Sequence, residues 1–334
     1  MNRIVALLAA SLLTLVLAAC GEKKDVLSSG SQQSFTLMLD WVPNADHVGI
    51  YRALAEGDFS RAGLRVNVQT PTDPATPLQL LAAGKVDAAI SYEPEVLLAR
   101  DRGEPLVSVA ALVQKPLTSI VSVGSKHITK PADLRGKKVG DAGIAYQHAY
   151  LQTILARAHV PAAKVKELNV GANLVPAMLS GRVDATLGSY WNYEAIQLQQ
   201  RGKRPNVIHM EQVGVPTYDE LVLVVRRSTI MTKTALVRRL VQALARGYES
   251  VRRDPRAGVA SLLRASPGLD AKLQQASVRV TLPVFFPPAG KPWGWQDAGR
   301  WNAYGQWMLN NHLISNPAAI ADASTNELLA GQGP

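Results

Sequence analysis

Two kinds of segment alternate along the chain, and they differ in their pattern of apolar and polar residues. Short, mostly apolar runs predict buried strands, and segments with apolar residues three and four positions apart predict amphipathic helices. The strand-like runs lie at 35–40, 64–69, 86–91, 106–112, 137–141, 165–169 and 183–187. The helix-like segments lie at 47–59, 76–83, 94–102, 147–159, 174–180 and 190–201, and the chain after 227 is mostly helical. This alternation predicts parallel sheets and the α/β fold class.

One stretch of sequence occurs twice in the alternating region. LAAGKVDAAI, from Leu81 to Ile90, recurs as MLSGRVDATL, from Met178 to Leu187. Each copy predicts a helix that ends at a glycine, followed by a buried strand and a tip of aromatic and acidic residues, SYE at 91–93 and SYWNYE at 189–194. Ligands of open α/β sheets bind beyond the carboxyl ends of the strands, so we expect two lobes whose tips line one cleft. A common helix-to-strand connection, used twice, is the simpler alternative.

Two further apolar runs, at 118–123 and 220–225, leave the two copies. We interpret them as strand-like crossings between the lobes, which would act as a hinge. The expected organisation is a discontinuous first lobe, 35–117 plus 227–334, and a continuous second lobe, 118–226.

The first twenty residues have the pattern of an export signal. Arg3 provides a basic start, an apolar region follows at 4–17, and the segment ends in Leu17-Ala18-Ala19-Cys20. This ending resembles the bacterial lipobox, in which cleavage leaves a lipid-modified cysteine as the first residue; a plain signal peptide that contains a cysteine is the alternative. We expect a signal peptide at 1–19, lipidation of Cys20 and a flexible tether at 20–34. The protein would then lie in the periplasm or at the cell surface, held to a bacterial membrane by lipid rather than by a span.

The composition excludes several kinds of chemistry. The chain of 334 residues contains one cysteine, which rules out a disulfide scaffold and a cysteine-ligated zinc or iron–sulfur site. Its six histidines have no metal-binding spacing, and the sequence contains neither a nucleophile elbow nor a Walker phosphate loop. We therefore expect no metal, no cofactor and no catalytic residue.

Much of the net charge of +10 comes from one segment. Residues 226–264 contain ten arginines and lysines against Glu249 and Asp254. Such a segment is typical of a solvated helix face, and contact with anionic lipid headgroups or with a partner protein is the alternative. The export signal argues against nucleic acid as a partner.

Aromatic and acidic side chains gather where the cleft is expected. Aromatic faces can enclose a flat ring, at about 0.5–1.5 kcal/mol per pair beyond the buried area. Ionised carboxylates accept hydrogen bonds from amino groups at about 1.5–3 kcal/mol each. The rim therefore favours a planar, nitrogen-rich ligand and disfavours an anion such as a sulfonate, because no arginine or lysine lies at these tips. The candidate rim consists of Trp41, Tyr92, Tyr190, Trp191, Tyr193 and Tyr218, with Asp40, Glu93, Glu95, Glu194, Asp219 and Glu220.

Other residues lie beside this rim or near the C-terminus. Asn44 and His47 belong to the turn after the first strand, where helix capping explains them equally well. Tyr146 follows a glycine turn at 140–143 and is a candidate for the cleft wall. The aromatic residues at 301, 304 and 307 have the spacing of a helix core.

Together these motifs resemble the solute-binding lipoproteins of ABC importers in the thiamine-pyrimidine precursor-binding family. The resemblance covers 35–310 and is carried by DWVPNADHVG at 40–49, SYEPE at 91–95, GSYWNYE at 188–194 and residues 214–221. It implies a type II periplasmic-binding-protein fold, closure of the two lobes, and delivery of the ligand to a permease and its ATPase. It implies ligands such as formyl-aminomethyl-pyrimidine or hydroxymethylpyrimidine, and a riboflavin-binding branch is similar too.

The resemblance also implies roles for individual residues. The side chains that would stack on the ligand are Trp41, Tyr190 and Trp191. Those that would make polar contacts are Asn44, Glu93, Asn192 and Glu194, while His47 and Tyr92 would form walls. With the remaining cleft residues, the candidate ligand site is Asp40, Trp41, Asn44, His47, Tyr92, Glu93, Tyr146, Tyr190, Trp191, Asn192, Glu194, Tyr218 and Asp219.

The same superfamily contains an enzyme, the fungal pyrimidine synthase. In that branch the loop after the first repeat carries a lysine, which binds pyridoxal phosphate, and a histidine, and a run of cysteines precedes the second crossing. Here residues 91–95 contain neither lysine nor histidine, and residues 214–220 contain no cysteine. We therefore expect a monomeric binding protein rather than an enzyme.

Overall fold

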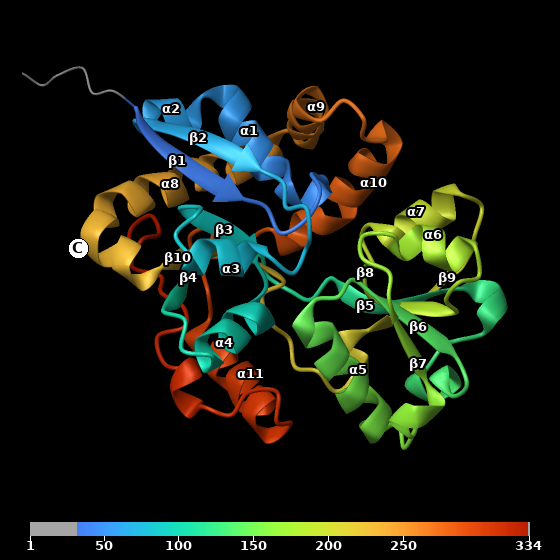
Figure 1. Cartoon of the computed structure of the whole chain (residues 1–334). Coiled ribbons are helices and arrows are strands. Elements are labelled where there is room, and N and C mark those ends of the chain that lie inside the picture. Colours follow the sequence, from blue (N-terminus) through green and yellow to red (C-terminus); the bar gives the residue numbers. More distant parts are fainter. Residues whose placement is uncertain (1–31, 333–334) are drawn as a thin grey trace, which may run out of the picture. The chain divides into compact units, whose positions relative to one another are not determined.

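Strands in two separate regions of the chain build two sheets (Figure 1). The computed structural model describes residues 32–332. The predicted signal peptide, the predicted lipidation site Cys20 and nearly all of the predicted tether lie outside these residues.

The first sheet has the strand order β2-β1-β3-β10-β4. The strands β1, β2 and β3 are parallel, and β10 runs antiparallel between β3 and β4. Every residue of β4 is buried, as is β10 up to its last residue, and both are therefore continuously apolar rather than alternating. The bounds of these strands are β1 (Gln33–Met38), β2 (Leu64–Gln69), β3 (Ala88–Ser91), β4 (Leu106–Val113) and β10 (Leu221–Arg226).

The second sheet has the order β7-β6-β8-β5-β9. Its strands β6, β7 and β8 are parallel, and β5 runs antiparallel between β8 and β9. The α/β class with two sheets is confirmed, although each sheet is mixed rather than wholly parallel. The bounds are β5 (Thr118–Val123), β6 (Lys138–Asp141), β7 (Lys166–Asn169), β8 (Ala185–Tyr190) and β9 (Pro205–His209).

Helices of varied length pack around the sheets. The predicted helix core near the C-terminus is confirmed for Trp301 and Tyr304, which are buried. The α-helices are α1 (Val48–Glu56), α2 (Asp58–Arg61), α3 (Pro77–Ala82), α4 (Glu93–Asp101), α5 (Ala145–Arg157), α6 (Leu174–Leu179), α7 (Glu194–Gln200), α8 (Arg227–Arg253), α9 (Pro255–Ala265), α10 (Ala271–Thr281) and α11 (Ala298–Asn310). The short 3₁₀ turns are η1 (Ala45–His47), η2 (Gly124–Lys126), η3 (Pro131–Leu134), η4 (Ala162–Lys164), η5 (Met210–Val213), η6 (Leu282–Val284) and η7 (Pro317–Ala319).

Two short connections join the sheets. The first is residues 114–117, between β4 and β5, and the second is residues 214–220, between η5 and β10. The apolar runs at 118–123 and 220–225, which the sequence suggested as the crossings, are instead essentially the sheet strands β5 and β10, because both are paired on two sides. Strand β10 pairs in the first sheet, although it falls within the 118–226 assigned to the second lobe; the lobe limits as a whole stay a prediction.

Both copies of the repeated segment form the same local structure. The glycine that follows each helix, Gly84 or Gly181, adopts a left-handed conformation with φ of 72°. Asp87 of the first copy accepts a hydrogen bond from the amide of Thr36 (2.8 Å), and Asp184 of the second accepts one from the amide of Lys138 (2.9 Å). These bonds fix β3 beside β1 and β8 beside β6, so both strands deliver their tips to the carboxyl edge of a sheet.

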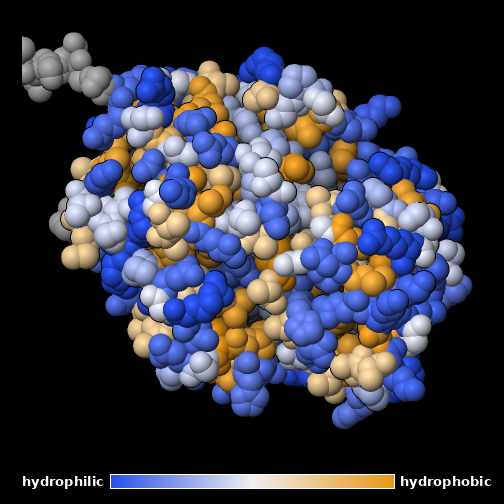
Figure 2. Space-filling view, viewed as in Figure 1, coloured by the Kyte–Doolittle hydropathy of each residue, from blue (hydrophilic) through white to orange (hydrophobic). Residues whose placement is uncertain are grey.

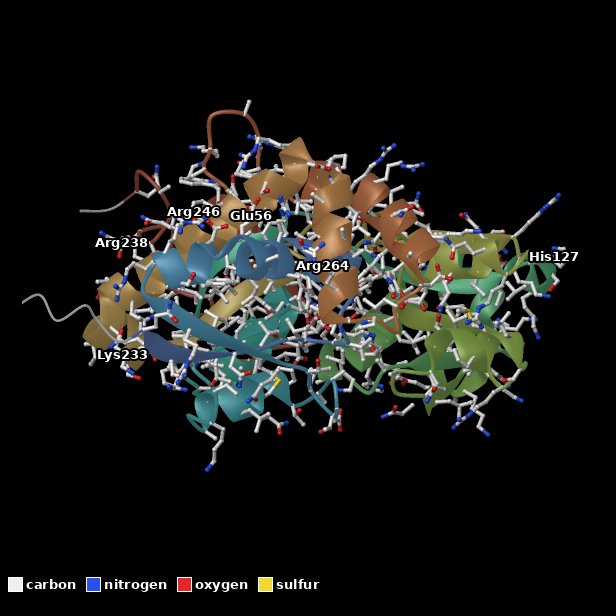
Figure 3. All side chains as sticks on the ribbon, turned by 90° about the horizontal axis from the view of Figure 1, so that it is seen from above. Glu56, His127, Lys233, Arg238, Arg246 and Arg264 are labelled. Atoms are coloured by element: carbon white, nitrogen blue, oxygen red, sulfur yellow. The ribbon has the colours of Figure 1, made fainter. Side chains whose placement is uncertain are left out.

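The basic segment belongs mainly to α8 and α9 and faces outward. Lys233 and Arg264 are exposed, and Figure 3 labels them with Arg238 and Arg246. Arg246 forms an ion pair with the buried Asp58 (2.9 Å). A solvated helix face is therefore confirmed, and contact with lipid or a partner stays a prediction. On the side of the molecule that Figure 2 shows, hydrophilic residues cover more of the surface than hydrophobic ones. Within residues 32–332, no helix is both long enough and apolar enough to cross a membrane.

Candidate functional site

A pocket lies where the carboxyl ends of strands from both sheets meet. Strands β1 and β3 lead into it from the first sheet, and β6 and β8 lead into it from the second. Trp41 and Tyr190, one from each sheet, share this hollow. Its lining consists of Asp40, Trp41, Asn44, Tyr92, Ala142, Ile144, Tyr146, Gln147, Leu174, Gly188, Tyr190, Tyr193 and Glu194.

A fixed carboxylate stands at the first-sheet end of the pocket. Asp40 follows β1; its Oδ1 lies 2.7 Å from His47 Nε2, and its Oδ2 accepts a hydrogen bond from the hydroxyl of Tyr92 (2.8 Å). The amide of Asn44 donates to His47 Nδ1 (3.3 Å), which assigns the imidazole proton to Nε2 and makes that nitrogen the donor to Asp40. Both donors orient the Asp40 carboxylate, which borders the pocket and retains lone pairs for a ligand.

A second carboxyl group borders the pocket from the second-sheet side. Glu194 is the first residue of α7, and its Oε2 accepts a hydrogen bond from the amide of Tyr190 (2.7 Å). Burial raises the pKa of Glu194 to about 7, against the lowering effect of that hydrogen bond. No arginine or lysine lines the pocket among the described residues. A ligand that brings amino or ring N–H donors would therefore supply the positive partner that Glu194 lacks.

Aromatic rings form much of the remaining pocket lining. The rings of Tyr92 and Tyr146 lie 5.6 Å apart between their centroids, at an angle of 57°. Burial raises the pKa of both tyrosines well above 10, so their hydroxyls stay protonated as donors. With Trp41, Tyr190 and Tyr193, these rings offer several faces to a planar ligand.

Several residues expected at the site lie behind the pocket rather than in its lining. His47 is fully buried and supports Asp40. The indole of Trp191 donates to the carbonyl of Pro116 in the first connection (3.0 Å). Asn192 is buried between η1 and α10. Tyr218 donates its hydroxyl to Glu220 (3.1 Å).

Two further expected residues, Glu93 and Asp219, form a buried acid pair. Glu93 Oε2 accepts a hydrogen bond from the amide of Asp219 (2.7 Å), and the indole of Trp301 donates to Asp219 Oδ2 (3.0 Å). Burial, followed by the negative charge of Asp219, raises the pKa of Glu93 well above its ordinary value. Burial also raises the pKa of Asp219 to about 6, against the pull of the Arg300 guanidinium. The pair thus links α4 to the second connection and does not reach the pocket.

Glu220 fastens the two connections to each other. Its Oε2 accepts hydrogen bonds from the amides of Leu117 (2.6 Å) and Thr118 (2.8 Å), and its Oε1 accepts one from the Thr118 hydroxyl (2.9 Å). Burial raises the pKa of Glu220 to about 7. The three acids Glu93, Asp219 and Glu220 form what we call the hinge cluster.

Sequence reasoning missed some of the pocket lining. Gln147 accepts a hydrogen bond from the amide of Ala142 (2.8 Å) and lies over Gly188, whose φ is 101°. The positive φ of Gly188 favours glycine, and a Cβ there would also stand 2.2 Å from Gln147 Nε2. Nothing in the sequence pattern singles out Gln147 itself. Ala142, Ile144 and Leu174 are ordinary apolar residues without a distinguishing signal.

Comparison with protein families gives one match. A family model described as NMT1/THI5 like matches residues 44–258.

Curated relatives match nearly the whole chain. A formylaminopyrimidine-binding protein from Halalkalibacterium halodurans is 33% identical over 92% of this chain and 94% of its own length. A 4-amino-5-hydroxymethyl-2-methylpyrimidine phosphate synthase from Legionella pneumophila is 24% identical over 90% of this chain and 94% of its own length. The binding protein is thus the more similar of these two relatives.

Solved structures share the fold. The alkanesulfonate-binding protein SsuA from Xanthomonas axonopodis pv. citri, bound to MOPS, superposes with a TM-score of 0.66 at 19% identity, covering 89% of this chain and 99% of that one. The type II periplasmic-binding-protein fold, with two α/β lobes, is therefore confirmed. At this identity the likeness shows the fold alone and not the ligand.

Proposed function

Because the chain belongs to the NMT1/THI5-like family, we propose that it is the extracytoplasmic solute-binding protein of an ABC importer for a thiamine-related aminopyrimidine. The 33% identity with the formylaminopyrimidine-binding protein supports a substrate-binding role. The ligand we propose is of the formyl-aminomethyl-pyrimidine or hydroxymethylpyrimidine type, held in the pocket between the sheets and delivered to a permease.

The placement of the two carboxyl groups carries this proposal. Asp40 lines the pocket from the first-sheet side and Glu194 lines it from the second-sheet side, together with several aromatic rings. An aminopyrimidine is a flat ring with amino groups at its edge, so it can stack on the walls while donating to the carboxylates. These contacts, added to apolar burial, support micromolar or tighter affinity.

An anionic ligand fits this pocket less well. A sulfonate would meet two carboxyl groups and no lysine or arginine among the described lining residues. Riboflavin stays the alternative planar ligand, and the binding measurement below distinguishes it from an aminopyrimidine.

A synthase activity like that named for the Legionella relative is the enzymatic alternative. No lysine lines the described pocket, and His47 is already engaged by Asp40 and Asn44. Both observations favour reversible binding over covalent chemistry.

Export and anchoring complete the proposal. Cleavage before Cys20 and lipid attachment to it would place the binding domain at a bacterial membrane, beside its permease. Mass spectrometry of the membrane-extracted protein tests this step, because lipidation adds acyl mass to a peptide that begins at Cys20. A soluble, unmodified product would contradict it.

Titration calorimetry tests the ligand. We expect formyl-aminomethyl-aminopyrimidine or hydroxymethylpyrimidine to bind at micromolar concentration or below, and to be recovered unchanged. Thiamine, riboflavin and an alkanesulfonate serve as comparison ligands. Tight binding of riboflavin or the sulfonate, with none of the aminopyrimidines, would refute the proposed ligand class.

A further inference from the structure

Asn192 crosses from the second-sheet tip to elements of the first-sheet side. Its side chain is fully buried, and its Nδ2 donates both to Asp46 Oδ1 in η1 (2.7 Å) and to Thr281 Oγ1 in α10 (2.7 Å). Beside it, Gln274 of α10 donates to the hydroxyl of Tyr193 (2.9 Å). Separation of the two sides of the cleft would break all three bonds. Asn192 therefore acts on the pocket through its position, not through contact with its lining.

Two buried oxygens at this contact have no hydrogen-bond partner in the described part of the chain. They are Asp46 Oδ2 and Asn192 Oδ1, the remaining oxygens of the two groups that already share one hydrogen bond. If Asp46 is ionised, both are acceptors, and a buried charge is left without a second donor. If Asp46 is protonated, its O–H can donate to the amide oxygen. A carboxylic acid and a primary amide then pair through two parallel hydrogen bonds.

We propose that Asp46 takes up a proton when the second-sheet tip seats against η1 and α10, and that the resulting acid–amide pair with Asn192 latches the cleft shut. Both are positioning residues, since neither lines the pocket. The inference rests on the proposed function in that the latch holds a bound solute in place. It adds that closure of the cleft is coupled to proton uptake from solvent.

The surroundings of Asp46 favour its neutral form. Burial favours the neutral form most strongly; His47 and the hydrogen bond from Asn192 oppose it, while Asp40 and Glu194 repel a further negative charge. The elements packed against η1 supply neutral groups: the hydroxyl of Tyr248 from α8, which donates to the Asp46 carbonyl (2.8 Å), and the buried sides of α9 and α10. The buried residues there are Gly258, Val259, Ser261 and Leu262 of α9, and Leu273, Gln274, Ser277, Val278 and Thr281 of α10.

The direction of the pH effect follows from this burial. Desolvation raises the pKa of Asp46 from 3.8 to about 7 in the seated arrangement. In an open, hydrated cleft the pKa returns toward 3.8, so closure binds a proton between these two values. Closure therefore weakens as the pH rises through this range, and stays weak above it.

Substitution of Asp46 by asparagine tests the latch. Asp46→Asn keeps both hydrogen bonds as an amide–amide pair but has no proton to gain. With hydroxymethylpyrimidine as the probe, we expect the affinity of Asp46→Asn relative to the unsubstituted chain to rise at least about tenfold from pH 5.5 to pH 7.5. Both affinities are measured with the same ligand, so protonation of the ligand affects them equally and cancels in their ratio. An unchanged ratio at the two pH values would overturn the proposal.

Gln274→Met is the matched control, because it removes the neighbouring cross-cleft bond without a titrating group. We expect Gln274→Met to weaken binding by the same factor at both pH values. If its factor instead changed with pH as that of Asp46→Asn does, the pH dependence would belong to closure in general, and the role of Asp46 would be overturned.

A second measurement needs no ligand and separates this inference from the proposed function. The melting temperature of ligand-free Asp46→Asn minus that of the unsubstituted chain should increase from pH 5.5 to pH 7.5. The reason is that the seated tip raises the pKa of Asp46, so the stability that seating adds to the ligand-free chain is lost as the pH rises. Failure of the unsubstituted chain to bind any aminopyrimidine would refute the ligand class alone. A melting difference and an affinity ratio that are both independent of pH would refute the latch, whereas a pH-dependent ratio with a constant melting difference would assign the proton uptake to closure around the ligand.

Discussion

The two copies of the repeated segment begin alike and end differently. In both, a glycine follows a helix, and an aspartate accepts a hydrogen bond from a backbone amide of the neighbouring strand. In both, a tyrosine is the residue before a short helix whose first residue is a glutamate, Tyr92-Glu93 in one copy and Tyr193-Glu194 in the other. Only the second glutamate lines the pocket.

The difference lies in the length of the tips. In the first copy, Glu93 follows the strand almost at once and meets the amide of Asp219 in the second connection. In the second copy, the tip is longer, and Glu194 turns back onto the amide of Tyr190 at the end of its own strand. The extra residues, Trp191 and Asn192, contact the first connection and α10.

One local pattern therefore supports two tasks. The short tip joins the hinge cluster and contributes one tyrosine to the pocket. The longer tip places its acid in the pocket and fastens the two sides of the cleft together. The comparison teaches that the repeat determines where each tip emerges, and that the number of residues after the strand determines where its acid points.

Loss of the hinge cluster should have the largest effect on stability. Glu220→Ala leaves the buried amides of Leu117 and Thr118 without an acceptor, and each such orphaned donor costs about 1–3 kcal/mol. We expect the free energy of unfolding in urea to fall by about 2–6 kcal/mol. Glu220→Gln, which keeps one acceptor oxygen, should lose less. A loss equal in both variants would show that the hydrogen bonds are not the cause.

The two glutamates that follow the tyrosines provide a matched pair. Glu194→Ala should weaken aminopyrimidine binding about ten- to hundredfold, the worth of one charge-assisted hydrogen bond, and should also lower the free energy of unfolding by about 1–3 kcal/mol because the Tyr190 amide loses its acceptor. Glu93→Ala should likewise lower the free energy of unfolding by about 1–3 kcal/mol, because the Asp219 amide loses its acceptor, but leave affinity nearly unchanged. Calorimetry and thermal melting of both variants check this; the same pattern of loss in both would remove the distinction between the tips.

Sequence alone located several strands well because their residues are buried throughout or on alternate positions. Continuous apolar runs gave β5 its exact limits and β4 to within one residue, and the alternation of Leu64, Val66 and Val68 with polar residues gave β2 its limits. Strand β9 was missed because it lies at a sheet edge, begins with Pro205 and buries only Ile208 fully. Its half-exposed sequence lacks both the alternating and the continuous apolar pattern.

The site was predictable only in part, for a geometric reason. Residues at or just after the end of a strand and outside a helix, such as Asp40 and Tyr190, emerge at the sheet edge, and the sheet largely fixes their position. Residues that already belong to the following helix or 3₁₀ turn, such as Glu93 and His47, point where their tertiary partners allow. Sequence patterns carry no information about those partners, the Asp219 amide in the case of Glu93.

Titration of Glu194 sharpens the comparison further. Burial raises its pKa from 4.5 to about 7, so the folded chain binds a proton that the unfolded chain has released. This contribution to stability is complete below pH 4.5 and is lost as the pH rises to 7. The melting temperature of the unsubstituted chain should therefore fall relative to Glu194→Gln over this range. Parallel curves would show that water or a neighbouring cation solvates Glu194 and that its pKa is ordinary.

The smallest expected effects come from the part that the copies share. Asp87→Asn and Asp184→Asn each weaken one carboxylate-to-amide bond at a strand start, so each should lower the free energy of unfolding at pH 7 by about 0.5–1.5 kcal/mol. Asp184 also pairs with the partly exposed Lys126 (2.7 Å), which adds at most about 1 kcal/mol.

The pH dependence of Asp184 is opposite to that of Glu194. Partial burial opposes its ionisation, yet the hydrogen bonds from Lys126 and the Lys138 amide outweigh burial and hold its pKa below the ordinary 3.8. A depressed pKa contributes stability that is present at neutral pH and is lost as the pH falls through the folded value. In urea unfolding, the gap between the unsubstituted chain and Asp184→Asn should therefore close on acidification. If Asp184→Asn leaves the free energy of unfolding unchanged at neutral pH while Asp87→Asn lowers it, the two aspartates do not play equivalent roles. The two copies would then differ already at the start of their strands, and not only in their tips.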